Sequence, residues 1–129
     1  MRIAVPSNGN RGLDEMVGEH FGRVPFYTIV DDTDMDVRVI PNSSHHMGGQ
    51  GYPPQLLAEE GVDIMVCSSL GRRAVDLFEN KGIRVYVGAT ATVRDAIGQW
   101  QSGKLNEATD ENACRQHAFR GSGQGYKTK

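Results

Sequence analysis

The second half of the chain alternates between short apolar runs and amphipathic stretches, and this alternation restricts the fold most. Residues 62–67 and 83–87 are apolar runs typical of buried strands. Between and after them, residues 53–61, 69–82 and 92–103 have helical spacing and begin at proline, serine or threonine. Strands joined by helices run parallel, with right-handed crossovers. The pattern therefore predicts an α/β fold.

The first half predicts three more strands, at residues 2–6, 26–30 and 37–40. The acidic turn at 31–34 joins the second and third strands into a hairpin. The first strand is uniformly apolar and is expected to be central. The most economical arrangement is a mixed five-stranded sheet of order 3-2-1-4-5, with strand 2 antiparallel, covered by three helices.

Length and composition limit the class of protein. The 129 residues suit one domain, which we expect at residues 1–105, followed by a polar, flexible tail at 106–129. The net charge of −2 argues against nucleic acid as a partner, and no apolar run approaches a membrane span. The two cysteines are too few for a disulfide scaffold. We expect a cytoplasmic protein.

The loops that follow the parallel strands must meet at one edge of the sheet, where open α/β sheets bind ligands. The loop after strand 1 carries His20, and the loop after strand 3 carries His45 and His46. Glycines there let a backbone approach a ligand closely, while helix N-termini and arginines favour anions. The residues expected to contact a bound group are Gly22, Arg23, Gly48, Gly49, Gly51, Ser69 and Arg72.

Histidine nitrogen and cysteine sulfur are the candidate metal ligands in this chain. His45 and His46 are adjacent, so a rigid extended segment cannot aim both at one metal; we prefer His45 as the ligand. Cys67 ends a buried strand and is interpreted as a small apolar residue. Cys114 and His117 have the spacing of half a zinc site. They are either a chance pair in a polar tail or ligands that complete the site if the tail folds back.

Several motifs, in order, resemble the dinitrogenase iron–molybdenum cofactor biosynthesis family. They are MRIAVP at the N-terminus, HFGR at 20–23, FYTIV at 26–30, HHMGGQG at 45–51, GVDIMV at 61–66, LGRRA at 70–74 and GIRVY at 82–86. The resemblance covers about residues 1–105. It implies a fold with a ribonuclease-H-like motif, in agreement with the strand order above.

The resemblance also implies a function and a class of cargo. Proteins of this family bind and carry metal–sulfur clusters or precursors of the iron–molybdenum cofactor, and the orange-protein branch holds a molybdenum–copper sulfide cluster. We therefore expect a nitrogenase accessory factor-like carrier or scaffold for an iron–sulfur, iron–molybdenum precursor or molybdenum–copper cluster. Its partners are expected to be cluster donor or acceptor proteins. The family pattern carries onto His20 and onto His45 or His46.

Two other functions compete with that of a carrier. A two-metal nuclease needs a carboxylate on the first strand, and residues 2–6 have none, so we expect no enzyme and no catalytic residues. A small regulatory module that binds a phosphorylated or nucleotide-like anion at helix N-termini is the alternative. In that case Ser68, Ser69, Arg72 and Arg73 matter more than the histidines.

Overall fold

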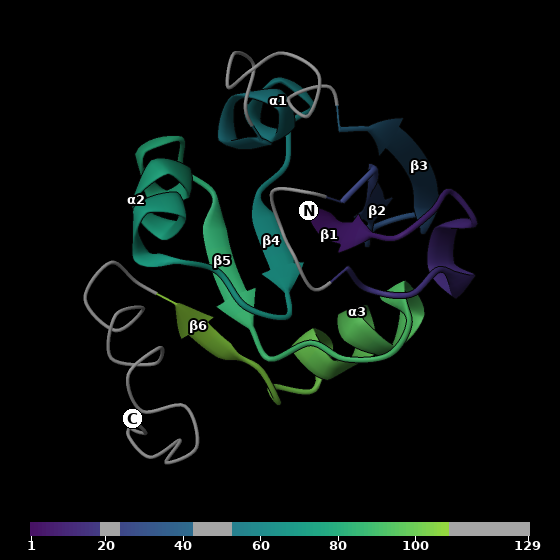
Figure 1. Cartoon of the computed structure of the whole chain (residues 1–129). Coiled ribbons are helices and arrows are strands. Elements are labelled where there is room, and N and C mark those ends of the chain that lie inside the picture. The colour runs from purple at the N-terminus through teal and green to yellow at the C-terminus, as the bar shows by residue number, and fades with distance from the viewer. Residues whose placement is uncertain (19–23, 43–52, 109–129) are drawn as a thin grey trace.

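The computed structural model describes residues 1–18, 24–42 and 53–108. A mixed sheet lies between helices that cover both of its faces (Figure 1). Within the described residues, the elements in chain order are β1 Arg2–Ser7, the 3-10 helix η1 Gly12–Asp14, β2 Phe26–Asp31, β3 Asp36–Pro41, α1 Pro53–Glu59, β4 Ile64–Cys67, α2 Arg72–Asn80, β5 Arg84–Val87, α3 Val93–Gln101 and β6 Asn106–Ala108.

The strand order is β3-β2-β1-β4-β5-β6. β2 runs antiparallel to β1 and β3, whereas β1, β4 and β5 are parallel to one another. The predicted order of the first five strands, the reversal of strand 2 and the α/β class are therefore confirmed. The acidic turn between β2 and β3 lies at the edge where β1 begins, since Arg2 pairs with Asp31.

A sixth strand extends the sheet beyond the five that the sequence predicts. β6 runs antiparallel to β5, and Arg84 Nε donates a hydrogen bond to Glu107 Oε2 at 3.1 Å across the pair. The sequence pattern places these residues in the polar tail because three residues without an apolar run carry no strand signal. Residues 109–129 lie outside the described part of the chain, so the flexibility expected for them stays a prediction.

Alternation along the central strands builds two cores, one on each face of the sheet. In β4, Met65 and Cys67 face α1 and α2, whereas Ile64 and Val66 face η1 and α3. Helix residues fill the two layers: Leu57, Val75 and Phe78 on one face, and Val93, Ala96 and Ile97 on the other. Figure 1 shows α1 and α2 on the side of the sheet opposite to α3.

Helix α2 begins later than the sequence predicts. Gly71 is its N-cap and no side chain caps it, so Ser69, the expected first residue of this stretch, lies before the helix. The reason is that Leu70 is part of the apolar packing beside this helix, and Gly71 still has an extended ψ of 159°. The buried positions of α2 are consequently Val75 and Phe78.

Candidate functional site

Four strands end along one edge of the sheet, which we call the C-terminal edge. The last residues of β1, β3, β4 and β5 lie there because these strands share one direction. The chain leaves β1 toward the α3 face through η1, but leaves β4 toward the opposite face through α2. Neighbouring strands whose connections diverge in this way form a crevice, which is the usual ligand position in open α/β sheets.

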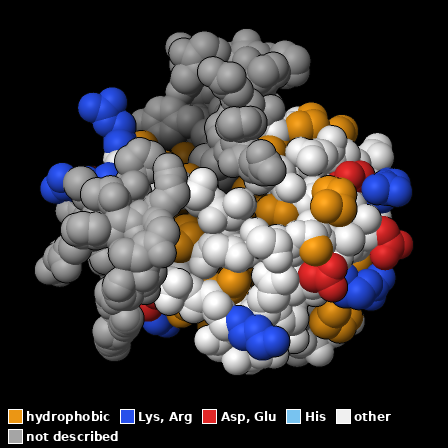
Figure 2. Space-filling model, turned by 60° about the horizontal axis from the view of Figure 1, so that its bottom comes forward, with side chains coloured by type: hydrophobic (Ala, Val, Ile, Leu, Met, Phe, Trp, Pro, Cys, Tyr) orange, Lys and Arg blue, Asp and Glu red, His pale blue; other side chains and the backbone are white. Residues whose placement is uncertain are grey.

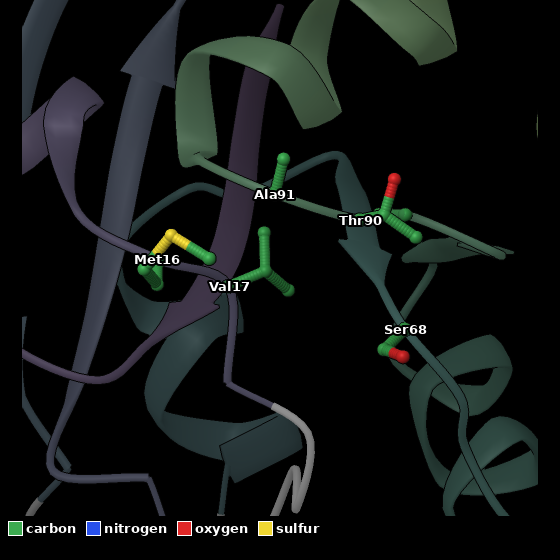
Figure 3. A pocket seen from close by; sticks show the side chains of 6 residues that line it. Met16, Val17, Ser68, Thr90 and Ala91 are labelled. Atoms are coloured by element: carbon green, nitrogen blue, oxygen red, sulfur yellow. The ribbon is translucent and has the colours of Figure 1, made fainter.

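A small pocket of about 140 Å³ opens at this crevice (Figure 3). Its lining residues come from three segments that follow β1, β4 and β5, namely Met16, Val17, Ser68, Ala89, Thr90 and Ala91. In Figure 3, Met16 and Val17 lie on one side of the pocket, across from Ser68 and Thr90. The lining is mainly apolar with two hydroxyl groups, and none of these side chains is charged.

The first wall of the pocket is the segment before Gly18, which is tied to the sheet and to the loop before α3. Met16 accepts a hydrogen bond from the amide of Asn8 at 3.0 Å, and the Val17 amide donates to the carbonyl of Ala91 at 2.9 Å. Val17 also bridges to Ser7 at the end of β1. Since backbone bonds hold it from both sides, the wall has a fixed position.

The second wall is the segment between β5 and α3. The Gln99 side chain makes two hydrogen bonds with the backbone of Thr90. Gln99 Oε1 accepts from the Thr90 amide at 3.1 Å, and Gln99 Nε2 donates to the Thr90 carbonyl at 3.3 Å. Ala91 has φ = 71°, which is in the left-handed region that residues other than glycine seldom adopt. Such conformations cluster at ligand sites, where the surrounding structure enforces them.

Glu15 anchors the first wall electrostatically. Its side chain is nearly buried; Oε1 accepts from Arg11 Nε at 3.2 Å, and Oε2 accepts from the Met16 amide at 3.1 Å. The hydrogen bond from Arg11 is the main reason why the pKa of this carboxyl group lies below its ordinary value. A Cβ at Gly9 would lie 2.5 Å from Glu15 Oε1, so a larger residue there would push the carboxylate out of its present position.

Cys67 belongs to the core and not to the pocket. It is 1% exposed, and its Sγ lies 3.7 Å from the Tyr86 carbonyl. Burial raises the pKa of the thiol to about 12, so the group stays protonated at neutral pH. The interpretation of Cys67 as a small apolar residue is consistent with this setting, because a protonated thiol is a poor metal ligand.

Charges of both signs are mixed on the face that Figure 2 shows. Acidic and basic side chains lie next to one another along one edge of this face. One pair of opposite charges in the described residues is Arg94 and Asp14, with Nη2 3.1 Å from Oδ1. That edge is therefore not a patch of a single sign of charge.

Of the residues predicted to contact a bound group, two lie in the described part of the chain. Ser69 follows the end of β4 and is exposed, and Arg72 is the exposed first residue of α2. Both are at the C-terminal edge, as expected from the strand order. The other predicted residues lie outside the described residues, namely Gly22, Arg23, Gly48, Gly49, Gly51, His20, His45, His46, Cys114 and His117.

Two segments that carry histidines, residues 19–23 and 43–52, are here called the histidine segments. The described residues that precede them, Gly18 and Asn42, lie close together at the C-terminal edge. Gly18 precedes the first segment and packs so closely on Val24 that a Cβ at Gly18 would overlap its side chain. Asn42 precedes the second segment; it is buried, and its Nδ2 donates to the carbonyl of Val24 at 2.9 Å. Val24 thus contacts the beginning of one segment directly and the beginning of the other through a hydrogen bond.

Nothing in the sequence indicates that Met16, Ala91 and Gln99 are part of the C-terminal edge. Their placement depends on pairing between a loop near the N-terminus and residues some 75 positions later, such as the bridge of Met16 with Thr92. No local periodicity signals such a contact. The strained φ of Ala91 has no sequence signal either, because alanine rarely takes this conformation.

Within the described ranges, no group of three or more histidine, cysteine, aspartate or glutamate side chains is arranged to hold a metal ion. No helix in the same ranges is long and apolar enough to cross a membrane.

The sequence is similar to a known family and to a protein of an archaeon. Residues 1–103 match a family described as dinitrogenase iron-molybdenum cofactor. An uncharacterized protein of Methanocaldococcus jannaschii is 30% identical over 112 residues, which is 83% of this chain and 91% of that protein.

Solved structures resemble the fold described above. The apo form of the orange protein from Desulfovibrio gigas is 29% identical, with a TM-score of 0.75, over 83% of this chain and 92% of that one. A putative NifB protein from Thermotoga is 32% identical, with a TM-score of 0.68, over 82% and 91% of the two chains. Most of this chain is therefore covered in each comparison.

Proposed function

The chain belongs to the dinitrogenase iron-molybdenum cofactor family, and from that premise we propose that it binds and carries a metal–sulfur cluster without catalysing a reaction. The cluster is cargo, received from a donor protein and passed to an acceptor. The orange protein from Desulfovibrio gigas, which this chain resembles, was solved in an apo form.

The observation that carries the proposal is the meeting of the two histidine segments at Val24. His20 follows Gly18 by two residues and His45 follows Asn42 by three, so chain length alone keeps them within about 7 Å and about 11 Å of these anchors. Since Gly18 and Asn42 both contact Val24, these chain lengths allow imidazoles from both loops to reach one ligand. The pocket lies immediately beside Gly18, at Met16 and Val17.

The proposed binding is weak and distributed. One or two imidazole nitrogens would bind the metal, while the glycine amides and Arg23, Ser69 and Arg72 would surround an anionic sulfide cluster. Cys67 is unsuited to such a site because its thiol is buried and protonated. A site with few covalent ligands suits a carrier, because few bonds must break before the cluster dissociates and the dissociation rate is therefore high.

Reconstitution under anaerobic conditions tests the proposal. We expect the protein to gain a charge-transfer absorption band with iron and sulfide, or with copper(I) and tetrathiomolybdate, and to retain the metal through gel filtration. The double variant H20A/H45A should lose the band, and a triple variant with H46A tests the neighbouring imidazole. T33A, in the turn at the opposite edge, is the control. A wild-type protein that retains no cluster contradicts the proposal; full retention in the triple variant removes these histidines from the site.

A second candidate function has one specific observation in its favour. The N-terminus of α2 has no side-chain cap and no acidic residue in its first turn, and it begins with Arg72 and Arg73. Such an end attracts anions, so a module that binds a phosphorylated or nucleotide-like anion is the alternative. A thermal-shift comparison separates the two functions. Stabilisation by phosphate or nucleotides, with none by metal–sulfide species, would favour the alternative.

A further inference from the structure

We propose that the Asn8–Gly9 peptide is a modification site at which the folded chain deamidates spontaneously, and that the product loosens the first wall of the pocket at Met16 and Val17. The chemical step needs no ligand and is independent of the proposed function. Its effect on cargo rests on that function, because the first wall borders the edge where the cluster is proposed to bind.

Asn8 is the one asparagine of this chain that glycine follows. In deamidation, the backbone nitrogen of the next residue attacks the carbonyl carbon of the asparagine side chain. A side chain on that next residue hinders the attack, and glycine has none. The six asparagines are Asn8, Asn10, Asn42, Asn80, Asn106 and Asn112, and each of the last five precedes a residue with a side chain.

The fold leaves both reacting groups of this dipeptide unrestrained. Asn8 is exposed and lies with Gly9 in a bend directly after β1. Within the described residues, neither the Asn8 side chain nor the Gly9 amide makes a hydrogen bond. A segment outside the helices and the strand ladders needs little energy for the local rotation that closes the five-membered ring of the intermediate.

Asn10 is the closest comparison, because it is exposed in the same bend. The residue after it is Arg11, which has a long side chain, and the Arg11 amide hydrogen-bonds to the Glu15 carboxylate. The nitrogen that would have to attack Asn10 is therefore both hindered and already engaged. The structure thus separates two neighbouring asparagines into a reactive and a protected one.

The reaction balances with water as its co-reactant. The Gly9 nitrogen loses its proton and bonds to Asn8 Cγ, the bond from Cγ to the side-chain nitrogen breaks, and ammonia leaves. Water then opens the cyclic imide at either of its two carbonyls. One product is aspartate. The other is isoaspartate, in which the main chain runs through the former side chain and is one methylene longer. Both products carry a carboxylate that is ionised at neutral pH.

Both products act on the first wall. Gly9 packs against Glu15, since a Cβ at Gly9 would lie 2.5 Å from Glu15 Oε1, so a longer main chain here displaces the carboxylate that holds the Met16 amide. The Asn8 side chain lies beside Gly18, where a Cβ would lie 3.1 Å from Asn8 Oδ1. A negative charge beside Gly18, next to the first histidine segment, repels an anionic cluster.

Mass spectrometry of aged protein tests the modification. Native protein is incubated at pH 8 in water labelled with oxygen-18, so that imide hydrolysis adds the label, and is then digested with trypsin in ordinary water. The expected peptide, Ile3–Arg11, contains both Asn8 and Asn10, which makes Asn10 the matched control. We expect label at Asn8, as aspartate and isoaspartate, and none at Asn10. N8Q should stay unlabelled, because glutamine would have to close a larger ring. Equal labelling of Asn8 and Asn10, or labelling of Asn8 in urea but not in native protein, would overturn the inference.

Thermal melting and cluster retention test the effect on the wall. Anion exchange separates the converted protein, which has one more negative charge, from the unconverted protein. We expect the converted protein to melt at a lower temperature and to retain less cluster after anaerobic reconstitution, whereas aged N8Q should equal fresh N8Q in both. Unchanged melting and retention after conversion would overturn the effect on the wall. The two proposals fail separately: if fresh wild type retains no cluster, the proposed function is wrong, and the mass spectra and melting curves still decide the modification.

Discussion

At the scale of single residues, burial decides which groups are available for chemistry. Cys67 directly precedes Ser68 of the pocket wall, yet it is buried in the core cluster that also contains Phe78 and Val85. Its position at the end of an apolar run already indicates an apolar role, so this part of the site could be predicted from sequence. The solvent-facing position of Met16 could not, because it depends on a bridge to Thr92 across the fold.

The burial of Cys67 predicts an unreactive thiol. In a C114S background, where Cys67 is the remaining cysteine, native protein should resist alkylation at pH 8 and react only as the pH approaches about 12, where the thiolate forms. In protein unfolded by guanidinium, the Cys67 thiol should be alkylated at the ordinary rate of an exposed cysteine. Mass spectrometry of iodoacetamide-treated samples measures this, and prompt alkylation of the folded protein at pH 8 would show that the thiol is accessible.

At the scale of elements, the loop after β1 is the part of the edge that the sequence describes least. The pattern indicates a long loop with a helical turn near residues 13–17, and the structure has η1 at Gly12–Asp14 followed by pairing of Met16 and Val17. The Glu15 carbonyl accepts from the Val93 amide at 2.8 Å, which joins this loop to α3. Strand order follows from the alternation of apolar runs, but loop docking of this kind depends on individual long-range bonds.

The charge of Glu15 should stabilise this docked loop in a pH-dependent way. Because the folded protein lowers the pKa of this carboxyl group, its contribution is full above the ordinary value of 4.5 and is lost as the pH falls through the lower folded value. We expect E15Q to lower the free energy of unfolding by about 1 kcal/mol at pH 7. Urea denaturation at pH 7 and pH 3 measures it. The difference from wild type should shrink at pH 3, and a constant difference would contradict the ionic role.

At the scale of the whole molecule, the six strands of the described residues and the helices on both faces form a scaffold that brings distant loops to one edge. The order 3-2-1-4-5 is predictable because apolar periodicity and crossover handedness leave few alternatives. β6 is not predictable in this way, since its three residues are polar or small and its pairing with β5 is the only reason for the strand. The domain boundary expected at residue 105 falls just before this strand.

Truncation tests where the folded unit ends. A chain ending at residue 108 keeps β6 and the Arg84–Glu107 ion pair, whereas a chain ending at residue 105 loses both. We expect the longer fragment to melt at the temperature of the full chain and the shorter one to melt lower. Cluster retention by the longer fragment also tests Cys114 and His117, which it lacks. Equal melting of both fragments would place the boundary at residue 105.

The most direct measurement is an amide NMR spectrum of the uniformly 15N-labelled protein with and without the reconstituted cluster. The account predicts that signals of Gly18, Val24, Asn42 and Ser68 shift or broaden, because these residues surround the meeting point of the histidine segments and the pocket. Signals of Thr33 and Asp34, in the turn at the opposite edge, should stay unchanged. Perturbation centred on that turn, with Gly18 and Asn42 unaffected, would contradict a metal–sulfur site at the C-terminal edge.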